Sequence, residues 1–236
     1  MAILEIRDLA SGYGEVQVLW GTSFDLREKK LTCLVGGNGV GKTTMLRTVM
    51  GLIRPWNGSV VFDGKDVSRL SAHEKAELGL TLVPEGRQLF TDMTVAENLE
   101  MGATNRRAQP KMKHNRELVY TMFPRLKERQ AQKSGTLSGG EQQMLAVGRG
   151  IMSDPVVLMV DELSLGLAPI LTLVLFESLR KLRDTGITIL LVEQNVQMAL
   201  AISDYGYVVA EGKVELEGPA KQLSKNEHIR TAYLGL

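Results

Sequence analysis

The sequence is poor in several features that would mark a specialised class of protein. It has one cysteine in 236 residues, so no internal disulfide can form, and Cys33 lies in an apolar run typical of a buried structural role. The 28 Lys and Arg residues nearly balance the 27 Asp and Glu residues, which argues against a dedicated polyanion binder.

Long hydrophobic runs are also lacking. The longest apolar stretches, such as Ile187–Val192, are far shorter than the ~20 residues that span a bilayer. The first residues, 1–8, include charged Glu5 and do not form the apolar core of a signal peptide. With 44% hydrophobic and 23% charged residues, the composition is that of a globular protein. We therefore expect a cytoplasmic protein without a membrane span.

Strand-like and helix-like segments alternate along most of the chain, which predicts an α/β fold. Ile3–Ile6 alternates weakly and predicts an edge strand. Leu31–Val35 is a short apolar run that predicts a strand ending at Gly36. Three continuously apolar runs predict strands covered on both faces of a parallel sheet: Leu80–Val83, Val156–Val160 and Ile187–Val192. Other expected elements are helices over Thr43–Met50 and from Pro169 to about Leu182, a strand over 58–62, and a hairpin of Tyr205–Ala210 and Lys213–Leu216.

The middle of the chain differs from the rest. From 89 to 151 the strand signals vanish, and the residues become charged and helical in periodicity. Within this stretch, 109–129 is rich in Lys and Arg, which we interpret as a solvated helix face rather than a nucleic-acid patch. We expect a single domain, 1–236, in which a helical subdomain, 89–151, interrupts an α/β core made of 1–88 and 152–236.

A glycine-rich loop follows the predicted strand Leu31–Val35. Its residues 36–43, GGNGVGKT, fit the phosphate-loop pattern G-x-x-x-x-G-K-[ST] between a predicted strand and a predicted helix. Backbone N–H groups of such a loop turn inward around phosphate oxygens, and the helix N-terminus adds partial positive charge. A plain glycine-rich turn, the alternative, needs no Lys-Thr pair, so we expect ATP to bind here. The expected contacts are Gly36, Asn38, Gly39, Gly41, Lys42, Thr43 and Thr44.

Two acids stand at the end of another apolar run. Asp161 and Glu162 directly follow Val156–Val160. Asp161 is suited to hold the hydration shell of Mg²⁺, and Glu162 to polarise an attacking water as general base. Alone, the pair also fits an ordinary strand end. Together with the phosphate loop, it indicates hydrolysis of the bound nucleotide.

Shortly before that strand, residues 137–143 read LSGGEQQ. Ser138, with Glu141 three residues later, fits a helix capping box, which is by itself an ordinary structural feature. Between a phosphate loop and an Asp-Glu strand end, however, the segment closely resembles the signature of ABC-type ATPases, and the resemblance covers essentially the whole chain. It implies a P-loop NTPase (RecA-like) core with an antiparallel β edge and an inserted helical subdomain.

The resemblance also implies a partner. In ABC-type ATPases the signature reaches across a head-to-tail dimer to the γ-phosphate of ATP bound by the other chain. Ser138, Gly139 and Gly140 are thereby expected to contact ATP on a second ABC ATPase chain, and their hydroxyl, amides and helix N-terminus suit an anion. Tyr13 resembles the aromatic residue that stacks on adenine, with a surface turn tyrosine as the alternative. Thr94–Leu99 resembles the start of the helical subdomain.

Three positions depart from the usual family pattern. Glu85 stands where a metal- and water-contacting Gln is usual; a carboxylate still binds Mg²⁺, and Gln88 is a weaker substitute. Gln194 stands where most relatives carry the switch His; it can donate a hydrogen bond to the γ-phosphate but does not titrate, so no rate dependence on an imidazole is expected. Ala168 replaces the usual Asp of the dimer-spanning loop, and Leu163 a usual Pro. The expected catalytic residues are Glu162, Gln194 and Lys42, and the expected metal ligands are Thr43, Glu85 and Asp161.

These departures resemble one branch of the family. Pro84–Arg87, Gly166–Pro169, Val192–Asn195 and a tail near Tyr233–Gly235 are similar to ATP-binding subunits of branched-chain amino-acid importers, with urea importers as the sister group. The resemblance implies an ATPase that is peripheral on the inner face of the cell membrane. Its implied partners are transmembrane permease subunits, a sister ATPase or a second copy of the chain, and indirectly a periplasmic or extracellular substrate-binding protein. No nucleic-acid partner is expected.

Two other functions stay open at this point. A non-transport ABC ATPase acting on DNA or ribosomes would carry a long coiled-coil insertion or two fused ATPase units, whereas this chain has a short insert and one phosphate loop. A regulatory module that binds but does not hydrolyse nucleotide is suggested by Glu85, Gln194 and Ala168. The presence of Glu162 argues against such a module. The variant Glu162→Gln distinguishes it from an ATPase, because a module that does not hydrolyse nucleotide has no turnover to lose.

Overall fold

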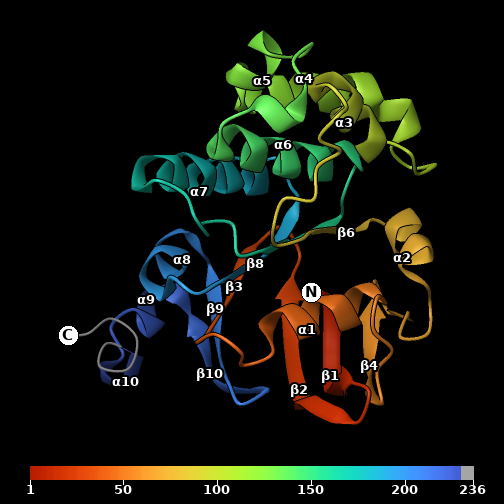
Figure 1. The fold of residues 1–236 in the computed structure, drawn as a ribbon. Helices are drawn as coiled ribbons and strands as arrows, with labels where there is room; N and C mark the ends of the chain where they lie inside the picture. Colours follow the sequence, from red (N-terminus) through yellow and green to blue (C-terminus); the bar gives the residue numbers. More distant parts are fainter. Residues whose placement is uncertain (230–236) are drawn as a thin grey trace.

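The computed structural model describes residues 1–229, which form two β-sheets and a group of helices (Figure 1). The importer-like tail near Tyr233–Gly235 lies outside the described residues. Within the described part of the chain, no helix combines the length and the apolar character needed to cross a membrane.

The larger sheet has six strands in the order β10-β9-β3-β8-β7-β6. Their bounds are β3 Leu31–Val35, β6 Leu80–Val83, β7 Val157–Asp161, β8 Thr188–Glu193, β9 Tyr205–Ala210 and β10 Lys213–Pro219. The β9–β10 hairpin is antiparallel, and the other pairings are parallel. Val157 and Met159 of β7 join the core on one side of the sheet, and Leu158 and Val160 join the core on the other. Burial on both faces explains why these strands are continuously apolar, as the sequence predicts.

The smaller sheet is antiparallel, in the order β2-β1-β4-β5. Its strands are β1 Ala2–Tyr13, β2 Val16–Arg27, β4 Asn57–Phe62 and β5 Lys65–Asp66. The prediction that Ile3–Ile6 forms an edge strand is wrong, because β1 pairs with β2 on one side and with β4 on the other. The alternation has a different cause: Leu4 and Ile6 are fully buried, while Glu5 between them is only half-buried.

Most of the helices lie between β6 and β7 or after β7. Two precede β6, α1 Lys42–Met50 and α2 Ala72–Leu78. Between β6 and β7 lie α3 Val95–Gly102, η1 Gln109–Lys111, α4 Met112–Met122, α5 Pro124–Glu128, η2 Ser134–Thr136 and α6 Gly139–Met152. After β7 follow α7 Pro169–Asp184, α8 Val196–Ile202, α9 Ala220–Leu223 and α10 Glu227–Ile229.

In Figure 1, α3–α6 lie at the top of the molecule and β1, β2 and β4 at the bottom, with strands of the larger sheet between them. One buried cluster joins Val95 and Leu99 of α3 to Val83 of β6 and Val160 of β7. The upper helices and the sheet therefore share a core. The division of the chain at 89 and 151 stays a prediction.

Several element ends follow the sequence signals. α1 ends at Gly51, which has a φ of 83° and whose N–H caps the helix. α7 begins at Pro169, as expected, and runs two residues beyond the expected end. Glu211 and Gly212, both at positive φ, make the tight turn of the predicted hairpin.

Candidate functional site

The glycine-rich loop turns between β3 and α1. A Cβ atom on Gly36 would lie 2.3 Å from the carbonyl oxygen of Val209, so the loop passes β9 at a distance that only glycine permits. Gly39 and Gly41 have φ values of 78° and 102°, which also favour glycine. No side chain caps the N-terminus of α1, so its first N–H groups keep their capacity to bind an anion.

A cavity of about 240 Å³, the phosphate-loop cavity, lies at this helix start. It is lined by Val18, Gly39, Gly41, Lys42, Thr43, Thr44 and Glu162. Most of the predicted phosphate contacts thus line one space, together with the predicted general base. Asn38 is exposed nearby in the same loop.

Lys42 is buried beside this cavity. Its Nζ donates to the carbonyl oxygens of Gly36 at 2.9 Å and Gly37 at 2.8 Å, and it lies 3.5 Å from Glu162 Oε1. The ammonium group therefore joins the phosphate loop to the acidic end of β7. Phosphate oxygens would compete well for its N–H groups, because a bond between two charged groups is stronger than a bond to a neutral carbonyl.

Asp161 is the buried last residue of β7, and its Oδ1 has no hydrogen-bond partner among the described residues. Burial raises the pKa of Asp161 to about 6; the Thr43 hydroxyl opposes this rise, and the charges of Glu162 and Glu85 add to it. A cation would compensate a buried carboxylate oxygen of this kind. Thr43, Glu85 and Asp161 supply the hydroxyl and carboxylate oxygens that Mg²⁺ prefers, so the residues fit the metal.

Glu162 has a left-handed backbone conformation with a φ of 46°. This conformation costs a non-glycine residue roughly 1–2 kcal/mol. The Glu162 N–H donates to the carbonyl oxygen of Val192 at 2.9 Å, which holds the turn against β8. Glu162 lines both the phosphate-loop cavity and a second cavity of about 380 Å³. A carboxylate in this position can accept a proton from a water that attacks a phosphate.

Glu193, the last residue of β8, is not among the residues that the sequence predicts. Its buried carboxylate accepts hydrogen bonds from the Ser164 N–H at 2.9 Å, the Ser164 hydroxyl at 2.8 Å and the Gln194 N–H at 3.2 Å. Burial raises the pKa of Glu193, and the Ser164 bonds oppose that rise. Glu193 therefore ties the loop after Glu162 to Gln194. The available signal was a second acid at the end of an apolar strand.

The other unusual positions lie around the same loop. Gln194 is exposed and lines a cavity of about 450 Å³ with Ser164, Leu165 and Gly166. Ala168 precedes α7 and makes no side-chain cap. Leu163 is fully buried in the core, where its side chain packs as an ordinary apolar residue.

The signature segment starts α6. The Ser138 hydroxyl donates to Glu141 Oε2 at 2.7 Å and accepts from the Glu141 N–H at 3.4 Å, in a complete capping box. A Cβ atom on Gly140 would lie 2.4 Å from Leu171 Cδ1, so α6 packs closely on α7. None of the residues that line the phosphate-loop cavity comes from 138–140. The structure therefore does not bring these two predicted parts of the site together within one chain.

Tyr13 is the last residue of β1, and its side chain contacts α1. Its hydroxyl accepts hydrogen bonds from Arg47 Nη1 at 3.4 Å and Thr44 Oγ1 at 3.5 Å. The exposed side chain lines a cavity of about 620 Å³ together with Glu85 and Asp161. An aromatic ring at the edge of such a cavity can stack on a nucleotide base.

Comparison with known proteins identifies the family of the chain. The family described as "ABC transporter" matches residues 19–164. The chain is 40% identical over 235 residues to the high-affinity branched-chain amino acid transport ATP-binding protein BraG of Pseudomonas aeruginosa, covering 99% of this chain and 100% of that protein. The chain belongs to the ABC transporter family.

One further relative and one solved structure are similar to nearly the whole of this chain, which we call the cassette from here on. The probable branched-chain amino acid transport ATP-binding protein LivF of Archaeoglobus fulgidus is 36% identical, with 97% of each chain covered. A crystal structure of the ADP conformation of an ATP-binding cassette of an ABC transporter has a TM-score of 0.84 and 26% identity, with 100% of each chain covered. The cassette is thus a nucleotide-binding ATPase with the P-loop NTPase fold expected from its sequence. The roles of its individual site residues stay predictions.

Proposed function

We propose that the cassette hydrolyses ATP to power an importer of branched-chain amino acids. The observation that supports this most directly is the 40% identity, over 99% of this chain and 100% of the relative, to a protein named for branched-chain amino-acid transport. The geometry supports ATP hydrolysis independently, because Lys42, Thr43 and Glu162 line one cavity at the N-terminus of α1.

In this proposal the phosphates of ATP occupy the phosphate-loop cavity. Thr43, Asp161 and Glu85 hold Mg²⁺, which when bound offsets the charge of the phosphates. Lys42 supplies a further positive charge, and Glu162 accepts the proton of the attacking water. The remaining predicted contacts are Gln194, which donates a hydrogen bond to the γ-phosphate, and Tyr13, which stacks on adenine.

A second ABC chain completes each site. The support is that Ser138–Gly140 begins α6, whereas the phosphate-loop cavity is lined from the β2, α1 and β7 regions of the chain. An uncovered phosphate-loop cavity and a distant anion-binding segment suit a head-to-tail pair, in which each chain supplies the part that the other chain needs. The second chain is a sister subunit or another copy of this chain.

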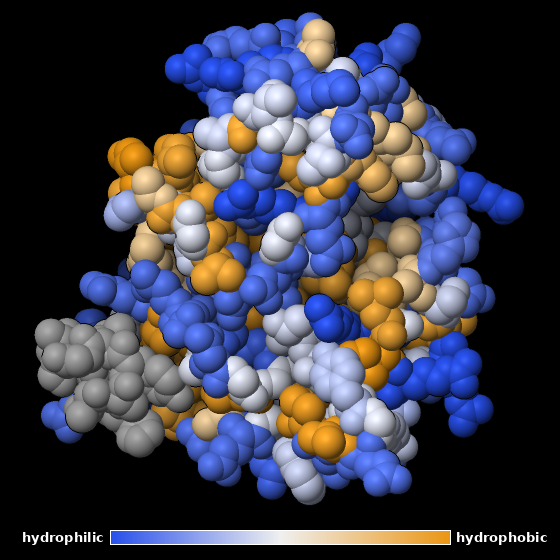
Figure 2. All heavy atoms as spheres, in the orientation of Figure 1, coloured by the Kyte–Doolittle hydropathy of each residue, from blue (hydrophilic) through white to orange (hydrophobic). Residues whose placement is uncertain are grey.

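We propose that the permease binds in a groove between the α/β core and the upper helices. A cavity of about 440 Å³ lies along this groove, and Leu82, Pro84 and Phe90 are among the residues that line it. Leu52 and Phe90 expose apolar side chains, and Figure 2 shows hydrophobic atoms between the upper helices and the lower sheet. Such a band suits an amphipathic helix of a membrane partner. The cassette would then be peripheral on the inner face of the membrane and would reach a substrate-binding protein through the permease.

Turnover of Mg-ATP by the purified chain, measured against its own concentration, tests the enzymatic part. Turnover per chain should rise with concentration, because each site needs a second chain. It should fall by ~10²–10⁴-fold in Glu162→Gln, which lacks the general base. Glu128→Gln is the control, since Glu128 is an exposed partner of Arg125. Equal turnover in wild type and Glu162→Gln would contradict the proposal.

The transported substrate needs a separate test. The chain replaces BraG in Pseudomonas aeruginosa, and uptake of radiolabelled leucine is measured. Restored uptake that is lost again in Glu162→Gln is expected. Uptake no higher than in cells without BraG, with the chain expressed and folded, would count against branched-chain amino acids.

A further inference from the structure

We propose that Arg87 is a positioning residue that couples the metal-binding side of the site to the signature helix. The inference rests on the proposed function, because it concerns the same two-chain site. Residues 84–91, the β6 loop, lead from β6 toward α3, and Arg87 lies in the middle of this loop.

The β6 loop contacts the metal site at its start and the upper helices at its end. Glu85 lines the same cavity as Asp161. At the other end, the Phe90 N–H donates to Asn98 Oδ1, Asn98 Nδ2 donates to the Phe90 carbonyl oxygen, both at 3.0 Å, and the Ser134 hydroxyl donates to that same carbonyl at 2.8 Å. The end of the loop must therefore move with the upper helices.

Arg87 joins the loop directly to the first turn of α6. Its Nη1 donates to Gln142 Oε1 at 2.9 Å, and its Nε donates to Gln143 Oε1 at 3.3 Å. Arg149, also on α6, donates to the Arg87 carbonyl oxygen at 3.3 Å. A Cβ atom on Gly139 would lie 3.1 Å from Arg87 Nη2, so the guanidinium lies against the signature glycine itself.

The backbone of the loop depends on such anchoring. Gly86, Arg87 and Gln88 have φ values of 78°, 65° and 45°, three consecutive residues in the left-handed region. Non-glycine residues persist there only where their surroundings hold them. The bonds from Arg87 to α6 supply that hold, and Glu85 is two residues away. Arg87 therefore links the part of the loop that carries Glu85 to the helix that begins at Gly139.

The shape of the guanidinium is essential to this role. Arg87 uses two nitrogens in fixed relative positions to bind two glutamine oxygens, and a lysine ammonium cannot reproduce that fork. Within the described residues, its side-chain hydrogen bonds go to these two neutral amides. The role therefore depends on geometry rather than on charge alone, which makes Arg87→Lys an informative variant.

The experiment compares wild type with Arg87→Ala, Arg87→Lys, Gln142→Ala and the double variant Arg87→Ala/Gln142→Ala. Arg116→Ala is the control, because Arg116 pairs with Glu100 on the surface of the upper helices. Turnover at saturating Mg-ATP, KM and the unfolding temperature are measured. We expect both Arg87 variants to lower kcat by about 10- to 100-fold, as misplaced catalytic parts do, with KM and unfolding temperature nearly unchanged. The double variant should be no worse than Arg87→Ala.

Full turnover in Arg87→Lys, parallel losses of kcat and stability, or additive effects in the double variant would overturn the inference. A second readout separates it from the proposed function: ATP-induced association of chains carrying Glu162→Gln. Arg87→Lys should weaken that association without changing ATP binding, and unchanged association would overturn the inference. If wild type shows no turnover and chains carrying Glu162→Gln alone do not associate with ATP, the two-chain site itself is contradicted instead.

Discussion

The helices α1 and α6 both direct their N-termini toward phosphate in the proposed complex, yet they begin in opposite ways. α1 starts after Gly41 with no side-chain cap, whereas α6 starts after Ser138 with a complete capping box. At α6, Glu141 already engages the Ser138 hydroxyl and pairs with Arg129 at 2.9 Å. The first amides of α1 have no such partner. The uncapped start of α1 can therefore bind phosphate within one chain. The start of α6 is already stabilised by its cap, and it contacts phosphate only when a second chain brings ATP to it.

The capping box itself does not distinguish the signature helix. α2 and α3 begin with the same box, formed by Ser71 with Glu74 and by Thr94 with Glu97. What distinguishes α6 is its surroundings, because Arg87 lies against its first glycine and α7 packs on its second. A local sequence pattern therefore predicts where a helix begins. The residues that pack against the helix end determine whether that end can contribute to a binding site.

Among the changes that test this comparison of helix ends, removing the ammonium group at the open end of α1 should have the largest effect. Lys42→Met keeps most of the side-chain volume and loses the charge beside Gly36, Gly37 and Glu162. A hydrogen bond between charged groups is worth ~1.5–3 kcal/mol, so ATP affinity should fall roughly 10- to 100-fold. Calorimetric titration with Mg-ATP measures the change, with the exposed Lys127→Met as control. Undiminished affinity would show that α1 does not bind the phosphates.

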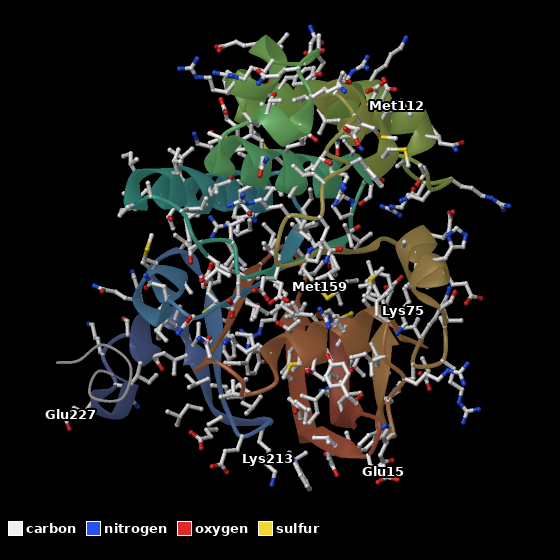
Figure 3. The ribbon with its side chains drawn as sticks, in the orientation of Figure 1. Glu15, Lys75, Met112, Met159, Lys213 and Glu227 are labelled. Carbon is white, nitrogen blue, oxygen red and sulfur yellow. The ribbon has the colours of Figure 1, made fainter. Side chains whose placement is uncertain are left out.

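The opposite end of α1 is closed, and Lys75 makes that closure testable. This fully buried lysine of α2 donates to the Val49 carbonyl oxygen at 2.7 Å beside the end of α1 (Figure 3), and burial lowers its pKa from 10.5 to about 8. Between these pKa values the unfolded chain binds more protons than the folded chain, so unfolding free energy rises with pH. Relative to Lys75→Met, wild type should gain up to ~1.4 kcal/mol per pH unit. Urea unfolding across this range measures the gain; a difference that does not change with pH would refute the lowered pKa of Lys75 in the folded chain.

The smallest effects come from the matched pair Ser138→Ala and Ser71→Ala. Each substitution removes a serine N-cap of the same type, from α6 and α2 respectively, so each should lower the free energy of unfolding by about 1 kcal/mol. Ser138→Ala alone should also lower turnover, by about 10-fold, because only that hydroxyl meets a phosphate in the two-chain site. The free energy of unfolding and the ATPase turnover of both variants are measured in parallel. Equal turnover in the two variants would remove Ser138 from the site.

The sequence predicts best where one physical cause dominates. Continuous apolar runs predict β7 and β8, because both faces of those strands are buried. β2 is not predicted: Gly21, Thr22 and Ser23 interrupt its pattern, and without β2 the neighbouring β1 is mistaken for an edge. The phosphate loop and the Asp-Glu pair are local motifs and could be identified directly.

The residues that sequence patterns miss act through distant partners. Glu193 binds Ser164 across a separation of 29 residues, and Arg87 binds Gln142 across 55. Neither contact leaves a periodic or spaced signal, because each depends on how β8 lies beside β7 and how the β6 loop meets α6. The partners of such residues can be identified only when the fold is known.

Mixing two inactive chains tests most directly the claim that two chains build each ATP site. Lys42→Met keeps the signature but loses the phosphate contact, and Ser138→Glu keeps the phosphate loop but places a negative charge in the signature. If two copies form the active pair, half of the dimers in an equal mixture are mixed and hold one intact site, so turnover should recover to about a quarter of the wild-type rate. A mixture no more active than its separate components, under conditions in which wild type is active, would contradict the two-chain site.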